Sequence, residues 1–205
     1  MVLITECLPQ PLADAGLRAM FEARKRVFVD LLKWDVPVLD ERFELDQFDD
    51  EHAVYLMIHG ERGEHLASAR LLETERPHIL DTLFADLCAG TVPRGPEVRE
   101  ITRFCLDRSL SAARRLAVRN RLVSALVDHA LQRGIARYTG VAEIGWLQQI
   151  LAFGWRCRPL GLPAACDGRT LGALTIEISP QTPALLMRAG VYTPGDALHD
   201  AREAA

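Results

Sequence analysis

VREITRFCLD at residues 98–107 and SAARRLAVRNRLVSALVDHALQRG at residues 111–134 are the most regular stretches of this chain. In the first, Val98, Glu100 and Thr102 alternate with Arg99, Ile101 and Arg103, which predicts a β-strand. The second carries apolar residues at helical spacing and ends at a glycine, a common residue after a helix, so it predicts a helix over 111–133. A strand that leads into a long amphipathic helix is typical of an α/β protein.

Shorter patterns on both sides extend this arrangement. Before residue 98 we expect a strand at 2–7, a helix at 13–31, a β-hairpin around the turn 61–64 and a short helix at 80–87. After residue 134 we expect a strand in ARYTGVAEI, a helix in IGWLQQILAFG, a strand in TLGALTIEIS and a terminal helix in LLMRAG. The predicted fold class is α/β, with a mixed central sheet flanked by helices in one domain over residues 1–205.

Composition and charge exclude several classes of protein. The chain has 205 residues, of which 49% are hydrophobic and 25% charged, as in soluble globular domains and unlike disordered or collagen-like chains. A net charge of -4 argues against nucleic acid as a partner. No apolar run approaches the roughly 20 residues that span a bilayer, and the first residues lack a signal peptide, so we expect a cytoplasmic protein with no membrane partner.

The cysteines and histidines do not predict a metal or disulfide site. The five cysteines are an odd number and include no CxxC pair. The six histidines do not occur at a ligand spacing with one another or with cysteine.

Charge is distributed unevenly along the chain. Residues 40–51, DERFELDQFDDE, hold seven acidic residues and one arginine, and we expect 35–51 to form an acidic mobile loop. Phe43, Leu45 and Phe48 within it predict that the loop folds back onto the core. Residues 99–137 instead contain nine arginines and three acidic residues. The contrast suggests two ligands of different charge.

Several separated motifs resemble those of the acyl-homoserine-lactone synthases, the autoinducer synthases of bacterial quorum sensing. The matching positions occur in the same order and at similar spacing: Arg24, Phe28 and Trp34; ELDQFD with Asp46 and Asp49; SARLL with Arg70; EITRF with Glu100 and Arg103; and Gly154-Trp155. The resemblance covers about residues 20 to 160.

This resemblance implies a GNAT-like acyltransferase fold and a two-step reaction. Such enzymes transfer an acyl group from acyl carrier protein, or in some members from acyl-CoA, to the amine of S-adenosylmethionine. The methionine carboxylate then closes the lactone and expels methylthioadenosine. No metal or bound cofactor is implied, since S-adenosylmethionine is a substrate.

The resemblance also implies a pocket for S-adenosylmethionine, and the residue types suit its charges. The implied residues are Arg24, Phe28, Trp34, Asp46, Asp49, Arg70 and Arg103. Carboxylates and arginines can pair with the ammonium and carboxylate of this substrate, and aromatic faces suit a sulfonium or an adenine. Taken alone, the acidic run also fits a solvated surface.

Glu100 is the residue we select as the general base, because the amine must lose a proton before it attacks a thioester. The alternative is that Glu100 pairs with neighbouring arginines and only supports the sheet. Cys105 in the same segment could suggest an acyl-enzyme, but no histidine follows at a recognisable position, so we expect it to pack in the core.

The predicted helix suggests contacts with the acyl donor. Five arginines are candidates for docking an acidic acyl carrier protein: Arg108, Arg114, Arg115, Arg119 and Arg121. An acyl tunnel between the sheet and the later helices could be lined by Leu122, Leu126, Trp146, Ile150 and Phe153. A solvated helix face is the alternative for the arginines.

Two other functions remain open. A GNAT N-acyltransferase that uses acyl-CoA would carry a glycine-rich phosphate loop, but the equivalent turn reads RSLSAARR with Ser111 at the first glycine position. A catalytically silent synthase-like binding protein is the second alternative. A nucleic-acid binder is disfavoured because 108–121 contains no aromatic residue.

Overall fold

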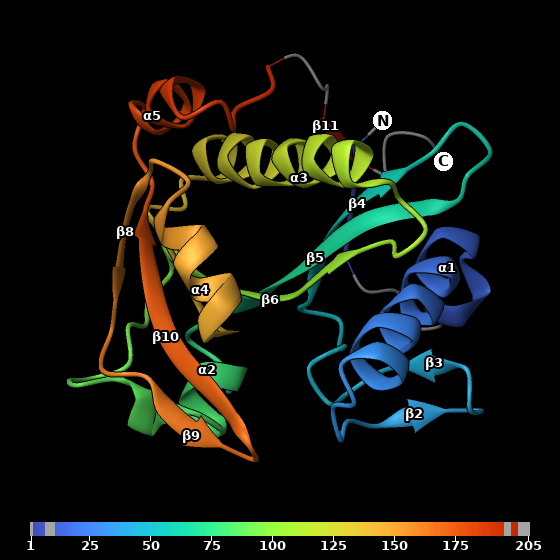
Figure 1. Ribbon diagram of the computed structural model, residues 1–205, viewed down its shortest axis with the longest axis horizontal. Helices are drawn as coiled ribbons and strands as arrows, with labels where there is room; N and C mark the ends of the chain where they lie inside the picture. Colours follow the sequence, from blue (N-terminus) through green and yellow to red (C-terminus); the bar gives the residue numbers. More distant parts are fainter. Residues whose placement is uncertain (1, 7–10, 195–197, 201–205) are drawn as a thin grey trace. The chain divides into compact units, whose positions relative to one another are not determined.

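The computed structural model describes residues 2–6, 11–194 and 198–200 (Figure 1). It divides into two compact units. Unit 1 contains residues 1–70, 103–125 and 194–205, and unit 2 contains residues 71–102 and 126–193. Strands β5 (His65–Glu73) and β6 (Val98–Leu106) and helix α3 (Ala112–Arg133) contribute residues to both. The expectation of a single domain stays a prediction.

Unit 1 begins with strand β1 (Val2–Glu6), a 3-10 turn (Pro11–Ala13) and helix α1 (Ala15–Arg24). β1 pairs antiparallel with β4 (Val54–His59) and parallel with β11 (Leu198–Asp200). The hairpin between β4 and β5 closes through a hydrogen bond from the Gly60 N–H to the Glu64 carbonyl of 2.8 Å. The predicted first strand and hairpin are confirmed, and Cys7 lies outside the described residues.

The predicted helix at 13–31 is confirmed, but its second half differs from an α-helix. Asp14 caps α1 by accepting a hydrogen bond from the N–H of Leu17 at 2.8 Å. From Lys25 to Leu31 the chain continues as a π-helix, η2. π-Helical turns are rare and occur often at functional sites.

The acidic segment at 35–51 contains a small hairpin that its sequence does not predict. Strands β2 (Val38–Leu39) and β3 (Phe43–Glu44) pair antiparallel. Phe43 and Phe48 are buried, which confirms that the segment folds back onto the core.

Unit 2 contains the remaining strands. β6 runs parallel to β7 (Arg137–Glu143), which pairs antiparallel with β10 (Arg169–Glu177). β10 also pairs antiparallel with β8 (Arg156–Pro159) and β9 (Ala164–Cys166). The sheet contains both parallel and antiparallel strand pairs, so the predicted mixed sheet is confirmed. The strands β8 and β9 were not predicted, because they are short and lack an alternating apolar pattern.

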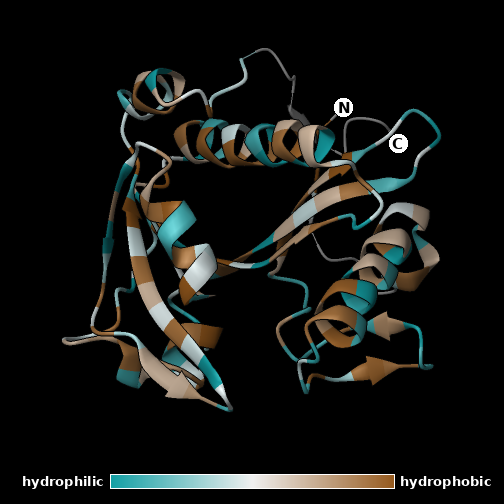
Figure 2. Ribbon diagram, in the orientation of Figure 1, coloured by the Kyte–Doolittle hydropathy of each residue, from teal (hydrophilic) through white to brown (hydrophobic). Residues whose placement is uncertain are grey.

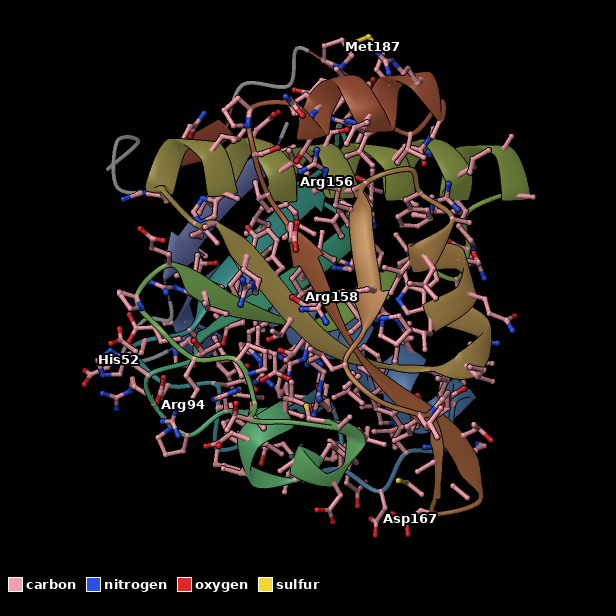
Figure 3. The ribbon with its side chains drawn as sticks, turned by 90° about the vertical axis from the view of Figure 1, so that its left-hand side faces the viewer. His52, Arg94, Arg156, Arg158, Asp167 and Met187 are labelled. Carbon is pink, nitrogen blue, oxygen red and sulfur yellow. The ribbon has the colours of Figure 1, made fainter. Side chains whose placement is uncertain are left out.

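Short helical segments accompany these strands in unit 2. They are α2 (Ile79–Thr82), a 3-10 turn (Ala85–Leu87), α4 (Ile144–Leu151) and α5 (Thr182–Arg188). α4 packs so closely on β10 that a Cβ atom on Gly172 would lie 2.7 Å from the Leu147 side chain. Arg156 and Arg158 lie exposed along the edge strand β8 (Figure 3).

The long helix α3 confirms the predicted helix, and Gly134 follows it with a φ of 68°. Hydrophobic and hydrophilic residues alternate around it (Figure 2). Leu122, Val123, Leu126 and Val127 are buried. Within the part of the chain that the structure describes, no helix has the length and hydrophobicity needed to cross a bilayer.

Candidate active site

A cluster of three arginines and three carboxylates lies in unit 1. Its members come from separate elements: Arg24 at the end of α1, Glu44 in β3, Asp46 and Asp49 in the turn after it, Arg70 in β5 and Arg103 in β6. All but Glu44 were predicted for one pocket. The cations and anions balance, so the cluster has no formal net charge.

Asp49 is the most heavily hydrogen-bonded carboxylate of the cluster. Arg24 binds it with two N–H groups, Nη1 to Oδ1 at 2.7 Å and Nη2 to Oδ2 at 2.8 Å. Arg70 Nη1 lies 2.7 Å from Oδ1, and the Tyr55 hydroxyl donates to Oδ1 at 2.7 Å. The backbone N–H of Asp46 donates to Oδ2 at 2.9 Å. Both oxygens of Asp49 are therefore engaged within the protein.

Asp46 bridges two arginines. Arg70 donates to it through Nη1 at 2.6 Å and Nη2 at 3.0 Å, and Arg103 donates through Nη2 at 2.7 Å. The exposed fractions of the Asp46 and Arg103 side chains are 5% and 9%, against 0–1% for the other four members. Asp46 and Arg103 are therefore the members of the cluster with the most access from solvent.

Glu44 connects Arg24 to Arg103 within the cluster. It accepts a hydrogen bond from Arg24 Nε at Oε2, and two from Arg103 at Oε1, at 3.0 and 2.9 Å. The side chain is fully buried. The sequence contained a signal for it, since Glu44 is the first residue of ELDQFD and stands two residues before Asp46.

The ion pairs keep these groups charged. Burial alone would raise the pKa of Asp49 and Asp46, but neighbouring arginines outweigh it and hold both pKa values below the usual range. Burial would lower the pKa of Arg24 and Arg70, and the carboxylates raise both above the usual value. At neutral pH these four groups are ionised.

Arg103 interrupts the alternation of β6. Glu100 and Thr102 are buried, but beyond Arg103 the buried position moves to Cys105. The backbone at Arg103 has φ 50°, in the left-handed region that side chains rarely adopt. As in a β-bulge, the extra residue turns a side chain away from its regular direction. The predicted strand and its alternation from Val98 to Arg103 are therefore confirmed, and the alternation does not continue beyond Arg103.

Two aromatic rings complete the predicted pocket residues. Phe28 and Trp34 stack with centroids 4.7 Å apart and planes 24° apart. The Arg103 guanidinium carbon lies 5.6 Å from the Phe28 centroid and 5.9 Å from the Trp34 centroid. The structure thus brings the seven predicted residues together, and their role in binding S-adenosylmethionine stays a prediction.

Glu100 lies in unit 2 and has a structural contact. Its side chain is fully buried, and Oε1 accepts a hydrogen bond from the N–H of Leu80 in α2 at 3.0 Å. Its Cα is paired with that of Thr139 in the parallel strand β7. The contact with Leu80 fits a supporting role, and its role as a base stays a prediction.

Cys105 packs in a cluster with Ala23 and Phe28. Burial raises the pKa of its thiol to about 12, so the thiolate needed for an acyl-enzyme is not formed at neutral pH. The prediction that Cys105 packs in the core is confirmed.

The predicted tunnel residues lie on the helices α3 and α4 and just after them. Leu122 and Leu126 are buried in α3, in units 1 and 2 respectively. Within unit 2 the rings of Trp146 and Phe153 contact edge to face, with centroids 5.8 Å apart, and Ile150 is half-buried in α4. The tunnel itself stays a prediction.

The predicted docking arginines differ in their surroundings. Arg108 and Arg114 are exposed, and Arg121 is half-buried. Arg115 donates to the carbonyls of Asp107 and Arg108, at 3.2 and 3.1 Å, and so closes the turn before α3. Arg119 donates to the Asn120 side chain at 2.8 Å. Arg108 and Arg114 are therefore the better candidates for contacting a partner.

Among the residues that the structure describes, no group of three or more His, Cys, Asp or Glu side chains is arranged to hold a metal ion.

Comparison with known proteins identifies the family. The sequence model described as autoinducer synthase matches residues 10–183. An acyl-homoserine-lactone synthase of Ralstonia nicotianae is 36% identical over 91% of this chain and 95% of its own length. The structure of BjaI, a CoA-dependent acyl-homoserine lactone synthase with SAM and isopentyl-CoA, superposes with a TM-score of 0.84 at 28% identity over 98% of this chain and 92% of that one.

An acyl-CoA N-acyltransferase from Pseudomonas aeruginosa has a TM-score of 0.58 at 15% identity, over 85% of this chain and 97% of that chain, and shares the fold. The GNAT-like fold is thereby confirmed. The cluster in unit 1 contains five of the motif residues on which the resemblance rests, Arg24, Asp46, Asp49, Arg70 and Arg103. This chain belongs to the autoinducer synthase family and is an acyltransferase.

Proposed function

We propose that this enzyme makes an acyl-homoserine lactone from S-adenosylmethionine and an acyl thioester. The amine of S-adenosylmethionine attacks the thioester carbonyl, and the thiol of the donor leaves. The methionine carboxylate then displaces the sulfonium at its γ-carbon, which closes the lactone and releases methylthioadenosine. S-adenosylmethionine is a substrate, and the reaction requires no metal and no bound cofactor.

The observation that carries this proposal is the charged and aromatic cluster in unit 1. Asp46 and Arg103, its most accessible members, supply an acceptor for the substrate ammonium and a donor for its carboxylate. Phe28 and Trp34 supply aromatic faces for the sulfonium or the adenine. These groups are held in place by the ion pairs that Asp49 makes with Arg24 and Arg70.

Glu100 is proposed as the general base that takes the proton from the attacking amine. A carboxylate that acts directly or through one water is sufficient for this step. The buried hydrogen bond from Leu80 would hold the carboxylate in one orientation. The supporting role and the catalytic role use different properties of Glu100, so a substitution can separate them.

The donor is proposed to be a thioester on acyl carrier protein or on CoA, and the acyl chain is proposed to contact Leu126, Trp146, Ile150 and Phe153 of unit 2. Exposed Arg108 and Arg114 suit an acidic carrier protein. The absence of a glycine at Ser111 favours the carrier protein, whereas the likeness to BjaI supports acyl-CoA. We also propose a cytoplasmic location.

One assay tests the proposal. Purified protein is incubated with S-adenosylmethionine and a panel of acyl carrier protein and acyl-CoA thioesters, and products are followed by mass spectrometry. Lactone and methylthioadenosine formed in equal amounts would support the proposal and identify the donor. Acyl transfer without methylthioadenosine would indicate an ordinary N-acyltransferase, and no turnover would favour a silent homologue.

A further inference from the structure

Tyr55 connects the charged cluster to the sheet of unit 1. It lies in β4, is fully buried and is paired with Thr5 of β1. Its hydroxyl donates to Asp49 Oδ1 at 2.7 Å. Asp49 itself lies in the turn before β4, where its backbone N–H donates a hydrogen bond to the Asp46 carbonyl at 3.0 Å. The hydroxyl therefore ties a carboxylate of a turn to a strand.

Tyr55 also reaches Arg24 by a second route. Its ring meets the Phe21 ring edge to face, with centroids 6.0 Å apart and planes at 82°. The Arg24 guanidinium carbon lies 5.0 Å above the centre of the same Phe21 ring. Tyr55 thus contacts both the carboxylate that binds Arg24 and the ring on which Arg24 rests.

The hydroxyl differs from the other donors to Asp49 because it is neutral. The three arginines of the cluster, Arg24, Arg70 and Arg103, are already balanced by its three carboxylates, so a further cation would leave a buried positive charge, which is costly. A neutral donor fixes the rotation of the Asp49 carboxylate without changing this balance. The hydroxyl also donates a hydrogen bond to a charged carboxylate, and such a bond is stronger than a hydrogen bond between two neutral groups.

We propose that Tyr55 is a positioning residue for S-adenosylmethionine binding. It does not touch the substrate: it holds Asp49, which holds Arg24 and Arg70, and Arg70 orients Asp46. The inference rests on the proposed function, in which Asp46 and Arg103 meet the substrate.

The test compares two buried tyrosines that lose the same atom. Tyr55→Phe removes the hydroxyl that binds Asp49. Tyr138→Phe, the matched control, removes an equally buried hydroxyl in unit 2 that donates to the Leu126 carbonyl at 2.9 Å. Both variants should lose thermal stability. S-adenosylmethionine binding is measured by calorimetry, and KM for S-adenosylmethionine and for the acyl donor by turnover.

We expect Tyr55→Phe to weaken S-adenosylmethionine binding and raise its KM by about tenfold, as expected for a lost hydrogen bond to a charged group. The KM of the acyl donor should stay within about twofold, and Tyr138→Phe should leave S-adenosylmethionine binding unchanged.

Equal S-adenosylmethionine affinities for Tyr55→Phe and the wild type would overturn the inference. So would failure of Tyr55→Phe to fold while Tyr138→Phe folds, since Tyr55 would then be a structural residue. If the wild type itself binds no S-adenosylmethionine, the proposed function fails first, so the two failures are distinguishable.

Discussion

Arg103 donates two hydrogen bonds to one oxygen of Glu44, a residue 59 positions earlier in the chain. The Arg103 backbone lies in the left-handed region, with a φ of 50°. Such a conformation costs on the order of 1–3 kcal/mol in a non-glycine residue. The hydrogen bonds to Glu44 and Asp46 offset this cost.

Replacement of Arg103 with lysine should lower kcat/KM for S-adenosylmethionine by about tenfold or more. Lysine keeps the charge, but its single nitrogen cannot reproduce the hydrogen bonds that Nε and Nη2 of Arg103 make to Glu44 and Asp46, and it has no planar group to lie over Phe28. Steady-state kinetics measure the loss. Arg99→Lys is the control, because Arg99 donates to the backbone carbonyls of Pro96 and Val98, and an equal loss in both variants would contradict the prediction.

Replacement of Glu44 with glutamine should destabilise the protein by about 3 kcal/mol, because removal of one partner leaves a buried charge uncompensated. The three arginines of the cluster would then face only two carboxylates, Asp46 and Asp49. The free energy of unfolding in urea measures this. Glu22→Gln is the control: its pairs with Arg26 and Arg42 are partly exposed, and we expect a change below about 1 kcal/mol. Equal losses would indicate that the Glu44 charge is not important.

Replacement of Glu100 with glutamine separates catalysis from support. Glutamine keeps an oxygen that can accept the Leu80 N–H but cannot take a proton, so kcat should fall by about 100-fold or more with the fold and S-adenosylmethionine binding retained. An unchanged kcat would remove Glu100 from the chemistry. Glu100→Ala should in addition lower thermal stability, because Leu80 loses its acceptor.

Replacement of Arg108 and Arg114 together with glutamate should raise KM for acyl carrier protein and leave KM for S-adenosylmethionine unchanged. The side chains are exposed, so reversal of their charge should repel an acidic partner and leave the fold intact. Arg115 is left in place because it closes the turn. The double variant Arg76→Glu and Arg188→Glu, also exposed, is the control, and equal effects would contradict a specific docking surface.

Stability should fall between about pH 6.5 and pH 4 because of His65. Burial, with a smaller effect of His59, lowers the pKa of His65 to about 3, against about 6.5 when unfolded. The depressed pKa means that the unfolded chain binds the proton first. The stabilisation is therefore complete above about pH 6.5 and is lost as pH falls, by up to about 1.4 kcal/mol per pH unit.

The urea unfolding free energy across this range measures the effect. In His65→Gln, which can still hydrogen-bond Ser68, the fall should be shallower. Asp46 and Asp49 have depressed pKa values and affect stability only near and below their unfolded pKa of about 3.9, so the window above pH 5 reports mainly on histidine. The same slope in both proteins would contradict the assignment to His65.

Periodicity predicted the elements that repeat a pattern over many residues. The helix α3 and the strands β4, β5, β7 and β10 follow from apolar spacing and glycine positions. The strands β8 and β9 could not be predicted, because a strand of three or four residues held by its neighbour β10 needs no pattern of its own.

Family resemblance, and not periodicity, predicted most of the charged cluster. Nothing local brings Arg24 and Asp49 together, since the contact depends on how α1 packs against the turn after β3. Glu44 and Tyr55 were missed for the same reason: each acts through a long-range contact. The left-handed backbone at Arg103 leaves no signal in the sequence, because an arginine in a strand-like segment does not predict a positive φ.

The equal number of cations and anions in the cluster has a consequence for the response to ionic strength. A site without net charge exerts little long-range attraction on its ligand, so dissolved salt has little to screen beyond the Debye length of about 10 Å at 0.1 M. Added sodium chloride should therefore change the affinity for S-adenosylmethionine only slightly. Association of a strongly acidic carrier protein with exposed Arg108 and Arg114 depends on unbalanced charge, and it should slow markedly in the same salt.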